Sequence, residues 1–136
     1  MRIFLDTNVL VSALTTRGLC WDLLNEATKD PACELLVSEA VLTEFSRTLM
    51  VKLKAPPEKA LQALAGIRQL TELVPQGESL PLPIPDPDDA PILASALAAK
   101  ADLFVTGDKA LLELGAIAGM VIASPRECWL KLRGTG

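Results

Sequence analysis

Short apolar runs alternate with helical patterns along the whole sequence, and this alternation restricts the possible folds more than any other feature. The runs predicted to form strands are residues 2–5, 34–37, 102–106 and 120–122. Strands that alternate with helices form a parallel sheet that helices cover on both faces. We therefore expect an α/β fold in a single domain that spans residues 1–136.

Helical patterns occupy the intervals between these runs. The predicted helices are residues 9–14, residues 18–28, a helix capped by Ser38 that ends near Lys52, residues 57–73, residues 90–99, and a C-terminal helix after the capping box that starts at Ser124. Residues 75–88 contain five of the ten prolines and are expected to form an extended surface connection. Proline in a first turn, as at residue 57, suits a helix because its missing N–H would have no partner there.

Four acidic residues stand where a predicted strand ends or on a predicted helix near its start: Asp6, Glu44, Asp89 and Asp108. The carboxyl ends of parallel strands meet at one edge of a sheet, so residues far apart in sequence come together there. Carboxylates crowded at such an edge repel one another and are pushed toward protonation unless a cation lies among them. The pattern therefore predicts a metal site.

Each acid taken alone has a simpler explanation. Asp6 can end a strand, Asp89 and Asp108 can be helix caps, and Glu44 can be a solvated helix residue. Independent caps have no reason to converge on one edge of a sheet, and the combination favours a shared site.

The third position is ambiguous, since Asp86, Asp88 and Asp89 are three acids in four residues. We choose Asp89 because it stands directly before a helix, and Asp88 remains the alternative or a supporting residue. Small polar residues adjoin the proposed ligands. Thr7, Asn8 and Thr106 can hold carboxylates by hydrogen bonds or act as ordinary caps.

Composition excludes several kinds of site. The sequence has no histidine and only three widely spaced cysteines, which argues against thiolate zinc sites and imidazole catalysis. A net charge of −4 argues against a broad nucleic-acid surface but not against a nuclease, because a bound metal neutralises carboxylates. The candidates for phosphate contact are Arg17, Arg47, Lys52, Lys54 and Lys109. The sequence shows no signal peptide and no apolar run long enough to span a membrane, so we expect a cytoplasmic protein.

Four segments together resemble PIN-domain proteins, in particular the VapC-like toxin components of bacterial and archaeal toxin–antitoxin pairs. They are FLDTNVLVSAL, SEAVLTEFSRTL, DPDDAPILASALAAKADLFVTGDKALLEL and SPRECW. The resemblance implies a three-layer α/β/α sandwich around a parallel sheet of about five strands. It also implies a ribonuclease dependent on Mg²⁺ or Mn²⁺, with Asp6, Glu44, Asp89 and Asp108 as metal ligands and catalytic residues. Thr7, Asn8 and Thr106 match the small polar positions of the family, and a small antitoxin is the implied partner.

The chemistry of the residues is consistent with this resemblance. Mg²⁺ keeps several waters and is held by a few carboxylates together with substrate phosphate. Metal ions placed in this way activate water for in-line attack on phosphorus, so we expect products with a 5′-phosphate and a 3′-hydroxyl.

Other interpretations remain open. One is a PIN-like module that acts through protein contacts without catalysis, and a less favoured one is a phosphorylatable receiver-type domain. A dehalogenase-type phosphatase would need a second aspartate where Asn8 stands. Half of the residues are hydrophobic and only 22% are charged. We therefore also expect a homodimer with a further apolar surface, formed by the helical stretches at residues 18–28 and 57–73.

Overall fold

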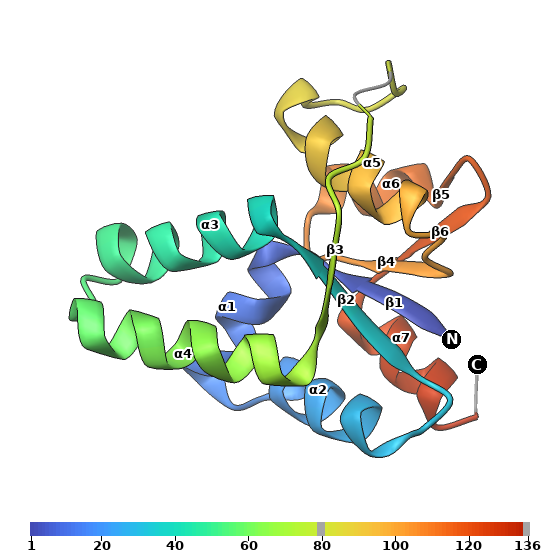
Figure 1. Ribbon diagram of the computed structural model, residues 1–136. Helices are drawn as coiled ribbons and strands as arrows, with labels where there is room; N and C mark the ends of the chain where they lie inside the picture. Colours follow the sequence, from blue (N-terminus) through green and yellow to red (C-terminus); the bar gives the residue numbers. More distant parts are fainter. Residues whose placement is uncertain (79–80, 135–136) are drawn as a thin grey trace.

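The computed structural model describes residues 1–78 and 81–134, which form a six-stranded sheet flanked by helices (Figure 1). The strands are β1 (Arg2–Leu5), β2 (Glu34–Ser38), β3 (Glu72–Val74), β4 (Leu103–Val105), β5 (Ala116–Ile117) and β6 (Met120–Ala123). Their order is β3-β2-β1-β4-β6-β5, and all neighbours are parallel except β5 and β6. The predicted α/β sandwich is confirmed.

The helices lie in two layers and a projecting pair. They are α1 (Thr7–Thr16), α2 (Leu19–Lys29), α3 (Glu39–Arg47), the π-helix η1 (Thr48–Lys52), α4 (Pro57–Leu70), the 3₁₀ turn η2 (Pro87–Asp89), α5 (Ala90–Ala98), α6 (Lys109–Leu114) and α7 (Pro125–Leu132). In Figure 1, α2 and α7 lie on one side of the sheet, α5 and α6 lie on the other, and α3 with α4 extends away from it. Among the residues described, no helix is long and apolar enough to cross a membrane.

The core is centred on β1 and β4, which are neighbours in the middle of the sheet. Phe4 and Phe104 are paired in register, and their rings stack with centroids 5.5 Å apart. Helices cover both faces of these strands, so their residues read as continuous apolar runs rather than as an alternating pattern. The buried apolar residues form one cluster that extends from Ile3 to Cys128.

The prediction of one helix over residues 57–73 is wrong at its C-terminal end. α4 stops at Leu70, Thr71 is extended with φ of −127°, and residues 72–74 become β3. This strand pairs with β2 from Leu36↔Glu72 to Ser38↔Val74. Leu70 and Leu73 have helical spacing, but both are exposed, so a longer helix would gain no burial from them. Residues 72–74 pair instead with the backbone N–H and C=O groups that β2 has available.

Two further details differ from the prediction. The sheet has six strands rather than about five, because the two-residue strand β5 forms a hairpin with β6 through Ala118 and Gly119, both at positive φ. The helix that Ser38 caps does reach Lys52, but its last segment is a π-helix. Residues 75–78 and 81–86 are irregular as expected, while residues 79–80 of that stretch lie outside the described residues.

The amino and carboxyl edges of the sheet carry different polar groups. At the amino edge, the Arg2 guanidinium bonds Glu34 at 2.7 Å and Glu72 at 3.5 Å. At the carboxyl edge, Leu5 and Val105 are the last paired residues of β1 and β4, so the residues after them, Asp6 and Thr106, leave the sheet side by side. This carboxyl edge holds the candidate site.

Candidate functional site

The four predicted acids line a single cavity of about 530 Å³ at the carboxyl edge of β1 and β4. Asp6 follows β1, Glu44 projects from α3, Asp89 precedes α5, and Asp108 precedes α6. The fold thus gathers four carboxyl groups that are spread over about a hundred positions of sequence.

Asp6 is the most buried of the four, with 9% of its surface exposed. One carboxylate oxygen, Oδ1, accepts a hydrogen bond from the Thr7 backbone amide at 2.8 Å, which caps α1. The other oxygen, Oδ2, accepts from the Thr106 hydroxyl at 2.8 Å and from the Asn8 side-chain amide at 3.2 Å. These bonds fix the orientation of the carboxylate at the floor of the cavity.

Thr106 and Asn8 connect the two strand ends. The Asn8 amide nitrogen also donates to the Thr106 hydroxyl at 3.2 Å, and the Asn8 carbonyl oxygen accepts from the Gly107 backbone amide at 2.8 Å. The Asp108 backbone amide donates to the Thr106 hydroxyl at 3.0 Å. Of the two roles considered for Asn8 and Thr106, the structure shows the first, hydrogen bonding to a carboxylate, and their bonds tie the loop after β4 to the start of α1.

Thr7 has a separate partner. Its hydroxyl donates to Oε2 of Glu44 at 2.8 Å. Glu44 is itself exposed on α3, so this hydrogen bond is what directs a flexible side chain toward the strand ends.

The remaining acids differ in how free their oxygens are. Asp108 caps α6 through Oδ1, which accepts from the Ala110 and Leu111 amides at 2.9 and 3.4 Å. Asp89 makes no side-chain cap although α5 starts directly after it. Asp86 instead caps the η2 turn by accepting from the Asp88 amide at 2.9 Å. Asp88 is exposed and is not among the residues that line the cavity.

The cavity disfavours negative charge on two of its acids. Burial raises the pKa of Asp6, and the hydrogen bonds from Thr106 and Thr7 only partly oppose this before the charges of Glu44 and Asp108 raise it further. Partial burial, followed by the charges of its acidic neighbours, raises the pKa of Asp89 to about 6. A cation in the cavity would remove both causes of strain, because it replaces lost hydration and offsets the repulsion.

The donor set fits a hard divalent cation that keeps part of its water shell. Within residues 1–78 and 81–134, no three acidic or thiol side chains are already arranged around one ion position. Mg²⁺ does not require such a cage, since one or two carboxylates and several waters usually hold it. Carboxylate oxygens are also the ligands that Mg²⁺ and Mn²⁺ prefer.

A second wall of the cavity was not predicted as a group. It is formed by Ser12, Thr15, Thr48 and Lys52, together with Val11. Of the five cations considered for phosphate contact, only Lys52 lines this cavity. The spacing of four residues from Asn8 to Ser12 and from Glu44 to Thr48 places each pair on one side of a helix, but spacing alone does not show that the two helix sides meet at one cavity.

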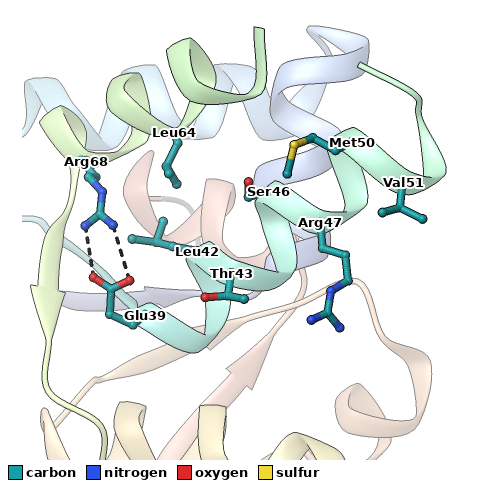
Figure 2. A pocket seen from close by; sticks show the side chains of 9 residues that line it. All are labelled: Glu39, Leu42, Thr43, Ser46, Arg47, Met50, Val51, Leu64 and Arg68. Carbon is teal, nitrogen blue, oxygen red and sulfur yellow. Dashed lines mark hydrogen bonds and ion pairs between the residues drawn. The ribbon is translucent and has the colours of Figure 1, made fainter. Parts of the chain in front are cut away.

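A different groove lies between α3 and α4, with a volume of about 460 Å³ (Figure 2). Leu42 and Leu64 face each other across it, and Met50 and Val51 stand at the end away from the sheet. Arg68 spans the groove near its sheet end and pairs with Glu39 at 3.3 and 3.4 Å. This groove is mainly apolar and shares no residue with the acidic cavity.

Fold and site together define an α/β/α protein with an acidic cavity at the carboxyl edge of a mostly parallel sheet. A family model described as PIN domain matches residues 2–110, and the chain therefore belongs to the PIN-domain family. The matched range contains all four acids of the cavity. The family resemblance noted in the sequence is thus confirmed.

Two solved structures share this fold. The first is VapBC2 from Rickettsia felis bound to a DNA fragment from its promoter, with a TM-score of 0.68, 18% identity, and coverage of 91% of this chain and 98% of that chain. The second is VapBC-1 from nontypeable Haemophilus influenzae, with a TM-score of 0.65, 16% identity, and coverage of 93% and 99%. The comparison with curated protein sequences gave no match.

Proposed function

We propose that this PIN-domain protein is an endoribonuclease that hydrolyses RNA phosphodiester bonds with the help of Mg²⁺ or Mn²⁺. The observation that carries the proposal is the cavity itself, where four carboxyl groups meet and the pKa values of Asp6 and Asp89 are raised. Perturbed acids gathered in one cavity are a feature of catalytic sites. Membership in the PIN-domain family agrees with a nuclease.

In this proposal the carboxylates of Asp6, Glu44, Asp89 and Asp108 hold the metal. Bound Mg²⁺ or Mn²⁺ supplies a water of lowered pKa and positive charge beside the phosphate. Asp6 is the fixed member, because Thr7, Asn8 and Thr106 hold its two oxygens. Glu44 is the adjustable member, held by one hydrogen bond from Thr7. The chain contains no histidine, so the lowering of the water pKa is assigned to the bound metal and not to an imidazole base.

Cleavage of a labelled single-stranded RNA in Mn²⁺ and in EDTA tests the proposal. Asp6→Asn, Glu44→Gln, Asp89→Asn and Asp108→Asn should each abolish cleavage while circular dichroism is unchanged. Asp88→Asn is the matched control, because Asp88 is exposed beside the same turn, and it should retain activity. Full activity of the wild-type protein in EDTA would contradict the metal mechanism, and a complete lack of cleavage in Mn²⁺ would favour a non-catalytic interaction module.

We also propose that the protein acts as the toxin of a toxin–antitoxin pair. The two solved structures named above are of VapBC2 and VapBC-1. The apolar groove between α3 and α4 offers a surface for an antitoxin, because Met50 and Val51 leave 40% and 66% of their surface exposed at its end. Co-expression with the product of an adjacent small gene, followed by co-purification, tests this part of the proposal.

A further inference from the structure

The acidic cavity is not lined by carboxylates alone. Lys52 and three hydroxyl groups, from Ser12, Thr15 and Thr48, also line it, and they come from α1 and η1 one or more helical turns beyond Thr7 and Glu44. A carboxylate cluster that holds a metal does not need an ammonium group beside it. An RNA strand gives this ammonium group a role, because the strand carries a phosphate on each side of the bond that is cut and a lysine can pair with one of them.

The π-helix explains how Lys52 reaches this cavity. An α-helix advances about 100° per residue, so a residue eight positions after Glu44 would be turned by about 80° from it. The wider i→i+5 turns of η1 advance each residue by less, and they bring Lys52 back toward the side of Glu44. Both residues consequently line the same cavity, with Thr48 between them in sequence. Such π segments inside helices are frequent at functional sites.

The Lys52 ammonium is not used by the fold. It is exposed, and none of the ion pairs found in the described parts of the chain includes it, although four acids line the same cavity. The side chain is therefore separated from the carboxylates by more than the 4.0 Å of an ion pair. The Thr48 hydroxyl likewise makes no hydrogen bond within residues 1–78 and 81–134, so both groups can donate to a ligand.

The other four cations are placed elsewhere. The Arg17 guanidinium stacks over Trp21 at 5.1 Å from the ring centroid. Arg47 lines the separate groove between α3 and α4 (Figure 2). Lys54 and Lys109 are exposed and do not line the acidic cavity. Lys52 is thus the candidate that the geometry selects.

We propose that Lys52 and Thr48 form a subsite for the RNA backbone phosphate next to the one that is cut. This inference rests on the proposed function. It places the substrate strand along α3 and η1, from the carboxylates toward Lys52. Contact with a phosphate carries no base information, so the subsite positions any single strand.

Binding of a fluorescein-labelled single-stranded RNA, followed by anisotropy in Mg²⁺ over a range of salt concentrations, tests the subsite. Glu44→Gln serves as the parent, since it should suppress cleavage during the titration. Adding Lys52→Gln should weaken binding and reduce the slope of log K against log salt by about 0.7, the value for one phosphate contact on a single strand. Lys52→Arg should retain the parent slope, and Lys54→Gln, the matched control two residues away, should leave it unchanged.

The catalytic readout separates this inference from the proposed function. In the protein with its acids intact, Lys52→Gln should raise KM and leave kcat close to wild type. Equal salt slopes for the parent, Lys52→Gln and Lys54→Gln would overturn the subsite even if cleavage is normal. A Lys52-dependent slope in a wild-type protein that cuts no RNA would support the subsite and overturn the hydrolysis instead.

Discussion

The carboxyl group of Asp89 lies near three other acids, and its side chain makes no cap to the helix that follows. Partial burial, and then the charges of Asp6, Asp86, Asp108 and Glu44, raise its pKa from 3.8 to about 6. The folded protein without metal therefore holds this proton more tightly than the unfolded chain does. For an acid with a raised pKa, stability falls as pH increases from about 4 to about 6 and the lost stability is not regained above that range.

Asp89→Asn should remove this loss. In EDTA at pH 7 the variant should melt about 2–4 °C above the wild-type protein. The difference should shrink toward zero at about pH 3, which lies below the pKa of Asp89 in both the folded and the unfolded state. Mn²⁺ at pH 7 should raise the melting temperature of the wild-type protein more than that of the variant, because ligand binding stabilises the native state. Thermal melts at both pH values check this, and identical curves for the two proteins in EDTA would contradict the repulsion.

Thr7 holds Glu44 through one hydrogen bond at 2.8 Å, and its replacement should affect the site more than the fold. Thr7→Val keeps the shape of the side chain and removes the hydroxyl, so Glu44 becomes free to rotate away. We expect cleavage in Mn²⁺ to fall by about 10- to 100-fold, as is common when a hydrogen bond to a metal ligand is lost. Thr16→Val is the control, since the Thr16 hydroxyl only donates to the Ser12 carbonyl within α1. A Thr7→Val enzyme as active as the Thr16→Val enzyme would show that this contact is dispensable.

At the level of single residues, the sequence predicts the acids better than it predicts their neighbours. Asp6 and Asp108 could be chosen because their positions after predicted strands fix where they lie. The choice of Asp89 over Asp86 depended on the start of one helix, and the structure puts Asp86 in a turn as a cap. Ser12, Thr48 and Lys52 were not grouped in advance, because a hydroxyl or lysine on a helix has no distinctive spacing until the neighbouring helix is in place.

Helix α5, which follows Asp89, contacts the irregular segment at residues 75–78. The Gly77 amide donates to the Ser95 hydroxyl at 3.1 Å, and that hydroxyl donates to the Pro91 carbonyl at 3.0 Å. The approach is so close that a Cβ atom at residue 77 would lie 2.2 Å from the Ala94 carbonyl oxygen. Gly77 therefore fixes the segment against the helix that positions Asp89.

Gly77→Ala should separate this segment from α5. We expect a loss of about 1–3 kcal/mol in the free energy of unfolding, because the clash is with backbone atoms that cannot move aside. Gly66→Ala is the matched control, as nothing lies within 4 Å of a Cβ there. It lies inside α4 and should stabilise the protein by about 0.5–1 kcal/mol. Urea unfolding measures both, and equal stability of the two variants would contradict the contact.

At the level of elements, long periodic helices and buried central strands could be predicted, while the two edge strands could not. The three residues of β4 are all buried and form an apolar run, whereas β3 and β5 at the sheet edges each contain only one buried residue. β3 forms because β2 offers it a partner, which is a property of the folded sheet and not of residues 72–74 themselves. The change from α-helix to π-helix at Thr48 has no sequence signature of its own either.

For the whole molecule, the expected homodimer remains a prediction that rests on exposed apolar side chains. Leu61 on α4 and Val51 on η1 leave 65% and 66% of their surface exposed. A dimer would cover such residues, and light scattering should then give twice the chain mass of 14.5 kDa. Leu61→Glu should yield the monomer without a loss of stability, because this side chain lies outside the core. A wild-type mass of 14.5 kDa at micromolar concentration would reject the dimer.

The central claim is that the carboxylate cavity directs metal-dependent hydrolysis of RNA, and the chemical nature of the cut ends tests it most directly. Mass spectrometry of the products formed in Mn²⁺ should find 5′-phosphate and 3′-hydroxyl ends, as expected for in-line attack by water. The same reaction with Asp89→Asn, or with the wild-type protein in EDTA, should give no products. Ends that carry a 2′,3′-cyclic phosphate, or equal cleavage by Asp89→Asn, would contradict the account.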